Sequence, residues 1–359
     1  MNSGNKGEWS EPYVFLRLLS EGKIHAADKE LNRIENIFYP ILEILRKEQK
    51  KYYKYSRESE VVIVSGDIPF ELRFPIADFT ENAALLLAEI KRNKGVFNAP
   101  EVNKFLNSLN YTEMKAPSKN KTDIQIKVHD RITGCDTTLG FSIKSCLGGK
   151  STLLNASKLT NFVFKVNNSV PDNDLASQLN KVSGKNAIGE KLSNLNNLSF
   201  ELIFDKMESS SFEANLRVID SKLPEILALI LKSCYSKEGT ALKKLVNLLD
   251  KTNPLNYPCT KDRNYYEYKV KRLLIDVALG MVPNKPWTGK FDVTGGYIIV
   301  KEDGDIVCYH IYNMNDFSDY LLDNTYLETA STSRNDFGYF YKENGSVYIK
   351  LNMQIRFIK

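Results

Sequence analysis

Two stretches of alternating apolar residues in the middle of the chain constrain its fold more than any other feature. They are residues 122–128 and residues 139–145. Strict alternation at a period of two predicts strands in which every second side chain points to the same face. The residues between them, Asp130–Asp136, are turn-like and include a glycine. We therefore expect the two strands to pair as a hairpin.

This hairpin would bring an acid and a lysine into one cleft. Asp123, Gln125 and Lys127 share a face of the first strand, and Ser142 and Lys144 share a face of the second. A carboxylate beside an ammonium is the arrangement that can hold a divalent metal ion against a phosphodiester, with the lysine near the attacking water. A surface hairpin that carries an unrelated aspartate and lysine would show the same pattern.

The ligands of such a metal ion would be oxygens, as Mg²⁺ requires. Asp123 supplies one carboxylate, and the backbone carbonyl of Ile143 could add a neutral oxygen. An acidic residue is expected two positions before the lysine, but Ser142 stands there. A second carboxylate must therefore come from another element.

The first predicted helix offers that carboxylate. We expect the helix to begin near Ser10, a favourable N-cap, with Pro12 tolerated in its first turn. Glu11 then lies at the start of the helix and is our candidate for the second acid. Glu8 is its competitor.

Positive charge is concentrated around the hairpin. The whole chain has 49 Lys and Arg against 44 Asp and Glu, a net charge of +5. Residues 115–168 carry three acids and nine basic residues, namely Lys115, Lys119, Lys121, Lys127, Arg131, Lys144, Lys150, Lys158 and Lys165. A positive surface around a carboxylate suits a polyanion that is both bound and cut, although a solvated lysine-rich face would have the same composition.

Several other classes of protein are disfavoured. The five cysteines are scattered without CxxC spacing, so we expect neither a disulfide framework nor a zinc site. We expect the protein to be located in the reducing cytoplasm. No apolar run approaches the length of a membrane span, so we expect no membrane partner. Residues 149–152 suggest a P-loop, but Lys144 occupies the place of its first glycine, so we expect no nucleotide cofactor.

The remaining chain alternates between helical and strand patterns. We expect helices and strands over the following ranges: strands at 61–67, 161–166, 198–204, 297–300, 306–311, 339–342 and 346–351, and helices at 81–92, 100–109, 151–159, 223–233, 240–250 and 264–279. Asp303–Gly304 and Asn344–Gly345 are strong hairpin turns. Residues 38–45 fit either a strand or a helix.

Five blocks of sequence, taken in order, resemble the HpaII-type restriction endonucleases. They are residues 4–11, 121–124, 140–145, 151–157 and 331–338. The resemblance implies the PD-(D/E)xK nuclease superfamily and an α/β (α+β) fold, with a mixed central sheet flanked by helices and a further helical and β-rich C-terminal region. It implies a nuclease core over residues 1–205 and a helical, hairpin-rich DNA-recognition region over residues 206–359.

The resemblance also assigns roles to residues of this chain. Asp123 matches the metal-binding aspartate of the superfamily, Lys144 matches its catalytic lysine, and Ser142 replaces the usual second acid. It implies Mg²⁺-dependent cleavage of double-stranded DNA at a short palindrome, which is CCGG for the best-known member. A palindromic target favours a homodimer on DNA.

Residues 331–338 form a separate candidate for DNA contact. Ser333, Arg334 and Asn335 suit phosphate and guanine contacts, because an arginine can bond guanine O6 and N7 in a bidentate fork. A polar loop between strands would have the same composition. Three further residues are expected to contact DNA, namely Lys121, Lys150 and Asn155.

We therefore predict a type II restriction endonuclease in which Asp123, Glu11 and Ile143 bind Mg²⁺ and Lys144 positions or activates water. Two alternatives stay open from the residues alone. One is a structure-selective repair or junction nuclease with the same centre. The other is a DNA-binding protein whose nuclease site has decayed, which Ser142 in place of an acid would allow.

Overall fold

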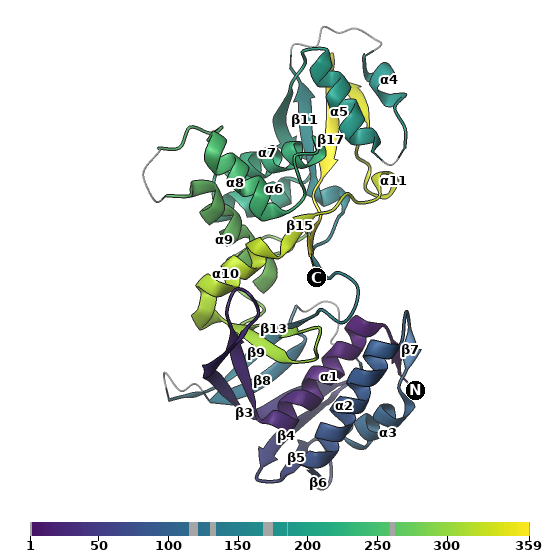
Figure 1. Ribbon diagram of the computed structural model, residues 1–359, viewed down its shortest axis with the longest axis vertical. Coiled ribbons are helices and arrows are strands. Elements are labelled where there is room, and N and C mark those ends of the chain that lie inside the picture. The colour runs from purple at the N-terminus through teal and green to yellow at the C-terminus, as the bar shows by residue number, and fades with distance from the viewer. Residues whose placement is uncertain are drawn as a thin grey trace. The chain divides into compact units, whose positions relative to one another are not determined.

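The structure is a computed structural model that describes residues 2–114, 121–129, 134–167, 175–184, 186–258 and 263–358. The chain folds into two compact units (Figure 1). The first consists of Met1–Ser151, Phe291–Tyr320 and Lys359, and the second of Thr152–Lys290 and Leu321–Ile358. This division differs from the expected boundary at residue 205, because the chain returns to the first unit at Phe291 before it leaves again.

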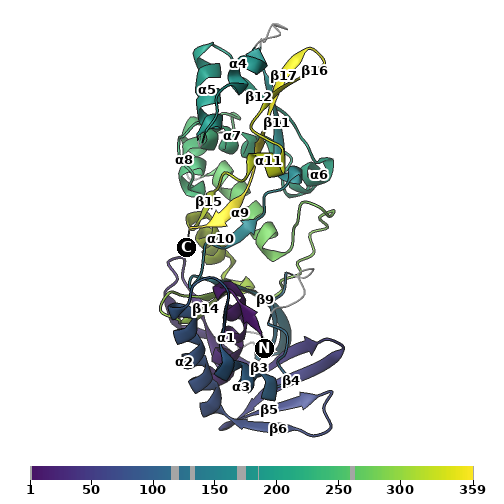
Figure 2. The ribbon, with the colours of Figure 1, turned by 90° about the vertical axis from the view of Figure 1, so that its right-hand side faces the viewer.

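The first unit is built on a large mixed sheet. Its elements are β1 (Ser3–Gly4), α1 (Lys6–Glu21), β2 (Lys23–Ala27), β3 (Arg33–Glu48), β4 (Lys51–Glu58), β5 (Val61–Gly66), β6 (Leu72–Pro75), α2 (Ile76–Arg92), β7 (Phe97–Asn98), α3 (Pro100–Ser108), β8 (Ile124–His129), β9 (Asp136–Ser145), β13 (Gly296–Val300), β14 (Ile306–His310) and a 3₁₀ turn, η2 (Ile311–Asn313). Among the described residues, nine strands form the sheet in the order β2-β14-β13-β9-β8-β3-β4-β5-β6. Figure 2 shows β4, β5 and β6 continuing the sheet beyond β3.

The long strand β3 closes part of this sheet on itself. Its first half pairs with β2, and its second half pairs with β8 and β4. Because β2 also pairs in parallel with β14, the six strands β2, β14, β13, β9, β8 and β3 form a closed ring. The ring gives β9 a hydrogen-bonded neighbour on each side, which fixes the strand that carries Lys144.

Helix α1 anchors the core of the first unit. Its buried side chains include Trp9, Tyr13 and Leu16, and it packs against α2 and β9 (Figure 1). The helix begins at Lys6 and not near Ser10, because Asn5 caps it. The Asn5 side chain accepts bonds from the Gly7 and Glu8 amides at 2.9 and 3.1 Å. Pro12 therefore lies inside the helix.

The second unit contains two small sheets and most of the helices. Its elements are β10 (Thr152–Leu154), η1 (Lys158–Thr160), β11 (Asn161–Val166), α4 (Leu175–Asn180), α5 (Ala187–Asn197), β12 (Leu202–Met207), α6 (Ser210–Ile219), α7 (Leu223–Tyr235), α8 (Leu242–Thr252), α9 (Tyr265–Leu279), β15 (Thr325–Leu327), α11 (Thr332–Asn335), β16 (Phe340–Glu343), β17 (Ser346–Asn352) and β18 (Ile355–Phe357). The sheets have the orders β12-β11-β17-β16 and β10-β18-β15. Helix α10 (Met314–Asp323) spans the boundary between the two units.

Most expected elements form, with three corrections. Residues 151–159 contain the strand β10 and a 3₁₀ turn in place of a helix, because β10 pairs with β18 near the end of the chain. Strand β12 starts at Leu202 and not at residue 198, because α5 runs to Asn197 and the next turn holds Ser199 at positive φ. Helices α6 and α10 were not predicted from the sequence.

The observed fold is thus mixed α/β, with helices beside several sheets. Residues 38–45 belong to the strand β3, which resolves the ambiguity in the sequence. The hairpin turns at Asp303–Gly304 and Asn344–Gly345 join β13 to β14 and β16 to β17, as expected. No helix in the described part of the chain combines the length and the apolar character needed to cross a bilayer.

Gly296 at the start of β13 is expected to contribute to the stability of the fold. Its φ is +106°, and an added Cβ would lie 1.9 Å from the carbonyl oxygen of Tyr309. Gly296→Ala should therefore lower the free energy of unfolding by about 1–3 kcal/mol or more, because strained backbone adds to the clash. Urea unfolding of the purified variant measures this change.

Gly149→Ala is the matched control, since nothing lies within 4 Å of a Cβ at that position. We expect it to change the unfolding free energy by less than about 0.5 kcal/mol. Equal effects of the two substitutions would contradict the proposed clash.

Candidate active site on the central strands

The expected hairpin is present and places Asp123 at its open end. Strands β8 and β9 pair antiparallel, with Ile124 opposite Phe141. The residues of the connecting turn between positions 130 and 133 lie outside the described residues. Asp123 comes directly before β8, and its backbone amide donates to the Phe141 carbonyl at 2.9 Å. The carboxylate therefore lies where the pairing of β8 with β9 ends.

The side chain of Asp123 is held by two donors from β9. Its Oδ2 atom accepts the Ser142 hydroxyl at 3.0 Å and the Ile143 amide at 2.7 Å. Two donors to one oxygen fix the orientation of the carboxylate. Ser142 therefore has a role of its own in the site, because its hydroxyl donates a hydrogen bond to Asp123.

Lys144 lies on the same side of β9 as Ser142, two residues further along the strand. Its Nζ is 5.3 Å from the centre of the Tyr297 ring. Burial lowers the pKa of Lys144, while the negative charges of Asp123 and Glu11 act in the opposite direction. The three side chains are therefore close enough for their charges to interact.

Glu11 and Glu8 have different surroundings, although both belong to α1. Glu8 completes the helix cap, because its Oε2 accepts the Asn5 amide at 2.8 Å. Glu11 lies three residues further along the helix, and its charge acts on Lys144 and on Tyr111. The structure brings Glu11 to the site and uses Glu8 for the end of the helix.

A second strand braces the site, and the sequence did not predict it there. β13 pairs in parallel with β9, with Tyr297 opposite Ser142 and Ile299 opposite Lys144. The residues expected to form part of a C-terminal recognition region therefore belong to the first unit. A parallel pairing between positions about 155 residues apart leaves no local signal in the sequence.

The loop before β13 holds the residues next to Asp123. The Thr122 hydroxyl donates to the Asp292 carbonyl at 2.9 Å, and the Gly140 amide donates to the Thr294 hydroxyl at 3.0 Å. A Cβ on Gly140 would lie 2.8 Å from two atoms of the Thr122 side chain. A glycine at this position lets Thr122 pack directly on β9, which fixes the backbone leading into Asp123.

Lys121 adds a second positive charge near Lys144. Burial, and then the charge of Lys144, lower the pKa of Lys121 to about 8, whereas Asp292 opposes this shift. Lys150 is exposed after the end of β9, and Asn155 is exposed in the second unit. Among these further predicted DNA contacts, Lys121 is the residue whose charge is coupled to that of Lys144.

The predicted recognition segment, residues 331–338, forms the short helix α11 and the turn after it, in place of a loop between strands. Ser333 and Arg334 are exposed. Asn335 is buried, and its side chain donates to the Ser331 carbonyl at 3.1 Å. Its own carbonyl accepts the Asn161 amide at 2.8 Å. Asn335 therefore positions the helix, and its expected DNA contact conflicts with its burial.

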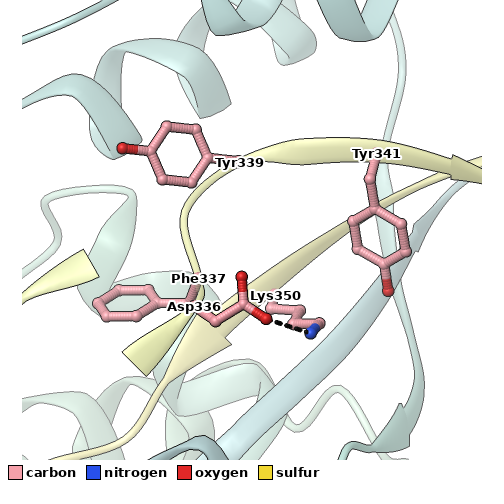
Figure 3. A pocket seen from close by; sticks show the side chains of 5 residues that line it. All are labelled: Asp336, Phe337, Tyr339, Tyr341 and Lys350. Atoms are coloured by element: carbon pink, nitrogen blue, oxygen red, sulfur yellow. Dashed lines mark hydrogen bonds and ion pairs between the residues drawn. The ribbon is translucent and has the colours of Figure 1, made fainter. Parts of the chain in front are cut away.

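A cavity of about 250 Å³ follows this helix (Figure 3). It is lined by Asp336, Phe337, Tyr339, Tyr341 and Lys350. The Lys350 ammonium lies 3.2 Å from Asp336 and 2.9 Å from Glu208, so this lysine already has two carboxylate partners. The contacts hold the turn after α11 against β17.

The donor set of the site fits a metal ion that needs few protein ligands. No group of three or more His, Cys, Asp or Glu side chains suited to a metal ion occurs among the described residues. Mg²⁺ is commonly held by one or two carboxylates, with water and substrate phosphates as its other ligands. Asp123 and Glu11 match this pattern, whereas a closed zinc cage would need more nitrogen or sulfur ligands.

Comparison with known proteins identifies close relatives. The profile of the HpaII restriction endonuclease family matches residues 5–357. The chain is 46% identical to the Type II restriction enzyme HpaII of Haemophilus parainfluenzae over 361 residues, which covers 99% of this chain and 99% of that protein. No solved structure matches.

The role of Glu8 as a helix cap can be tested by stability alone. Glu8→Ala should lower the free energy of unfolding by about 1 kcal/mol, because the Asn5 amide loses its acceptor. Glu8→Gln should retain most of the stability, since a glutamine oxygen can accept the same bond. Denaturant unfolding of both variants measures the difference, and equal stability of the alanine variant and the wild type would contradict this role.

Proposed function

The chain belongs to the HpaII restriction endonuclease family and is a site-specific deoxyribonuclease, and we propose that Asp123, Glu11 and Lys144 form its catalytic centre. Type II restriction enzymes act on double-stranded DNA and generally use a divalent metal ion. We propose Mg²⁺ as that ion, with Asp123 and Glu11 as its carboxylate ligands.

The observation that carries this proposal is the hydrogen bonding of Asp123 to Ser142 and Ile143, the two residues before Lys144 on β9. The charges of Asp123 and Glu11 both act on the Lys144 ammonium, which supports their grouping in one centre. A bound Mg²⁺ would polarise the scissile phosphate and a water molecule.

The chain's own residues have distinct tasks in this mechanism. Ser142 and the Ile143 amide fix the Asp123 carboxylate through Oδ2, and Oδ1 would be the oxygen that holds the metal ion. The carbonyl and amide of one residue point to the same edge of a strand. The Ile143 carbonyl is therefore on the edge of β9 that faces Asp123, where it can serve as a neutral ligand.

Lys144 has two properties suited to phosphodiester hydrolysis. Its ammonium can stabilise the negative charge that develops on the phosphate, and its lowered pKa favours proton exchange with a nearby water. Lys121 supplies additional positive charge on the same side. The product would carry a 5′-phosphate and a 3′-hydroxyl.

The target of cleavage is proposed from the relative. We propose a short palindrome, with CCGG as the first sequence to test, and a homodimer that matches its two-fold symmetry. Arg334 and Ser333, exposed on α11, are the proposed base and phosphate contacts. Lys150 and Asn155 are proposed as further DNA contacts. We propose a cytoplasmic protein, as expected for a restriction enzyme.

Substitution of the catalytic residues tests the centre. Asp123→Asn and Lys144→Met should each lower the rate of duplex cleavage in Mg²⁺ by at least about 100-fold, because metal-ion and proton-transfer catalysis contribute at least that much. The measurement is the single-turnover rate on a long duplex that contains CCGG sites. Omission of Mg²⁺ should abolish the discrete fragments.

Lys127→Met is the matched control for Lys144. Lys127 is also a strand lysine of the hairpin, but it lies toward the turn and 3.8 Å from Asp136. We expect its cleavage rate to stay within a few-fold of the wild type. Wild-type activity in Lys144→Met, or cleavage confined to branched DNA, would refute the proposed function.

Arg334 tests the recognition role of α11. Arg334→Ala should reduce discrimination between the cognate site and a site with one changed base pair by about 1–3 kcal/mol if the arginine reads a guanine. The measurement is the ratio of cleavage rates on the two duplexes. An equal loss on both duplexes would limit Arg334 to a phosphate contact.

A further inference from the structure

A second cavity in the second unit has the composition of an anion site. Its volume is about 300 Å³, and it is lined by the start of α5, the end of α7 and parts of the segment 329–339. Among the described residues that line it are two lysines, Lys191 and Lys237, and no aspartate or glutamate. The other polar lining groups are hydroxyls and amides, which can all donate hydrogen bonds.

Lys191 is the central group of this cavity. It is 2% exposed, and its ammonium donates to the Gly338 carbonyl at 2.9 Å and to Asn180 Oδ1 at 3.3 Å. The Tyr339 ring lies 4.5 Å away. All three partners are uncharged, and no ion pair of Lys191 occurs in the described part of the chain. A buried ammonium without a counter-ion is costly, and an ammonium has three protons to donate.

The first turn of α5 adds a second source of positive potential. Ala187, Ile188 and Gly189 at the start of this 11-residue helix line the cavity. Asn186 precedes them without a side-chain hydrogen bond to the helix amides. The amino end of a helix attracts anions through its amides and its dipole. The Lys191 ammonium and the amino end of α5 thus both contribute positive potential to this cavity.

We propose that this cavity binds a phosphate group. The buried Lys191 ammonium supplies the charge, the amino end of α5 adds the positive end of its dipole, and the exposed Lys237 supplies a second cation. A cavity of this size can also accept the sugar next to the phosphate. The phosphate gives Lys191 the anionic partner that its protein surroundings do not supply.

Duplex DNA is the source of phosphate that the structure favours. Thr332, Gly338 and Tyr339 line the cavity and belong to the segment that includes α11. A phosphate held here would fix that segment at a defined position along the backbone of the DNA, while Arg334 contacts bases. This choice of source rests on the proposed function, but the phosphate site itself does not.

Two measurements on the full-length protein, both in EDTA so that no cleavage occurs, test the proposal. The first is the shift of the thermal unfolding midpoint with inorganic phosphate. The second is the slope of log Kd against log salt for a duplex. The variants are Lys191→Met and Lys237→Met. Lys232→Met is the matched control, because Lys232 is a partly buried lysine of the same unit that donates to the Leu202 carbonyl at 3.2 Å.

We expect phosphate to stabilise the wild type and Lys232→Met, but not Lys191→Met. The salt slope should fall by about 1 in Lys191→Met, as for the loss of one phosphate contact. Loss of the phosphate shift with an unchanged slope would support the site and assign it to a free phosphate. Wild-type behaviour of Lys191→Met in both assays would overturn the proposal.

Lys237→Met keeps the test decisive if Lys191→Met does not fold. Lys237 is exposed, so its substitution should not affect folding, and it should weaken the phosphate shift. An unchanged shift in Lys237→Met, with Lys191→Met unfolded, would also overturn the proposal. Both assays are made without cleavage, so a failed catalytic assignment would not be mistaken for a failed phosphate site.

Discussion

Two hydrogen bonds from β9 to one oxygen of Asp123 hold together the centre of the first unit. Asp123 Oδ2 accepts both the Ser142 hydroxyl and the Ile143 amide. These bonds replace strand pairing at the point where β8 begins, so the sheet stays joined although the backbone ladder has ended. The same bonds fix the orientation of the carboxylate, whose charge acts on Lys144. Local structure and the proposed chemistry therefore depend on one side chain.

The neighbouring elements keep that side chain in place. β13 supports β9 from the other edge, and the loop before β13 accepts a hydrogen bond from the Thr122 hydroxyl. Helix α1 brings Glu11 to the site, and its capping box sets where the helix starts. Each part of the centre thus comes from an element that is fixed by contacts of its own.

The hairpin and its two central residues could be predicted because their signals are local. Alternation over seven residues identifies each strand, and a turn between them identifies the pairing. The same reasoning could not place β13 beside β9, since parallel strands far apart in the sequence are joined only by the tertiary fold. The start of α1 was missed, although Asn5 followed three residues later by Glu8 is a capping pattern.

Side-chain roles were harder to predict than strands. From the sequence we interpreted Ser142 as the replacement of an expected acid, because a sequence does not show that a hydroxyl donates to a neighbouring carboxylate. Asn335 was predicted to contact DNA, because the sequence of a polar segment does not show that one of its side chains is buried. Lys191 had no recognisable motif at all, and its lack of a charged partner becomes visible only in three dimensions.

The first unit is built from two separate segments of the chain, and this limits how recombination between related genes can produce a folded protein. The unit with Asp123 and Lys144 is assembled from Met1–Ser151 and Phe291–Tyr320, so the other unit is interrupted by one of its essential hairpins. A single crossover between residues 151 and 291 of two related genes would combine β9 of one parent with β13 of the other. Exchange of whole gene halves would therefore pair two strands that have not been selected to fit each other.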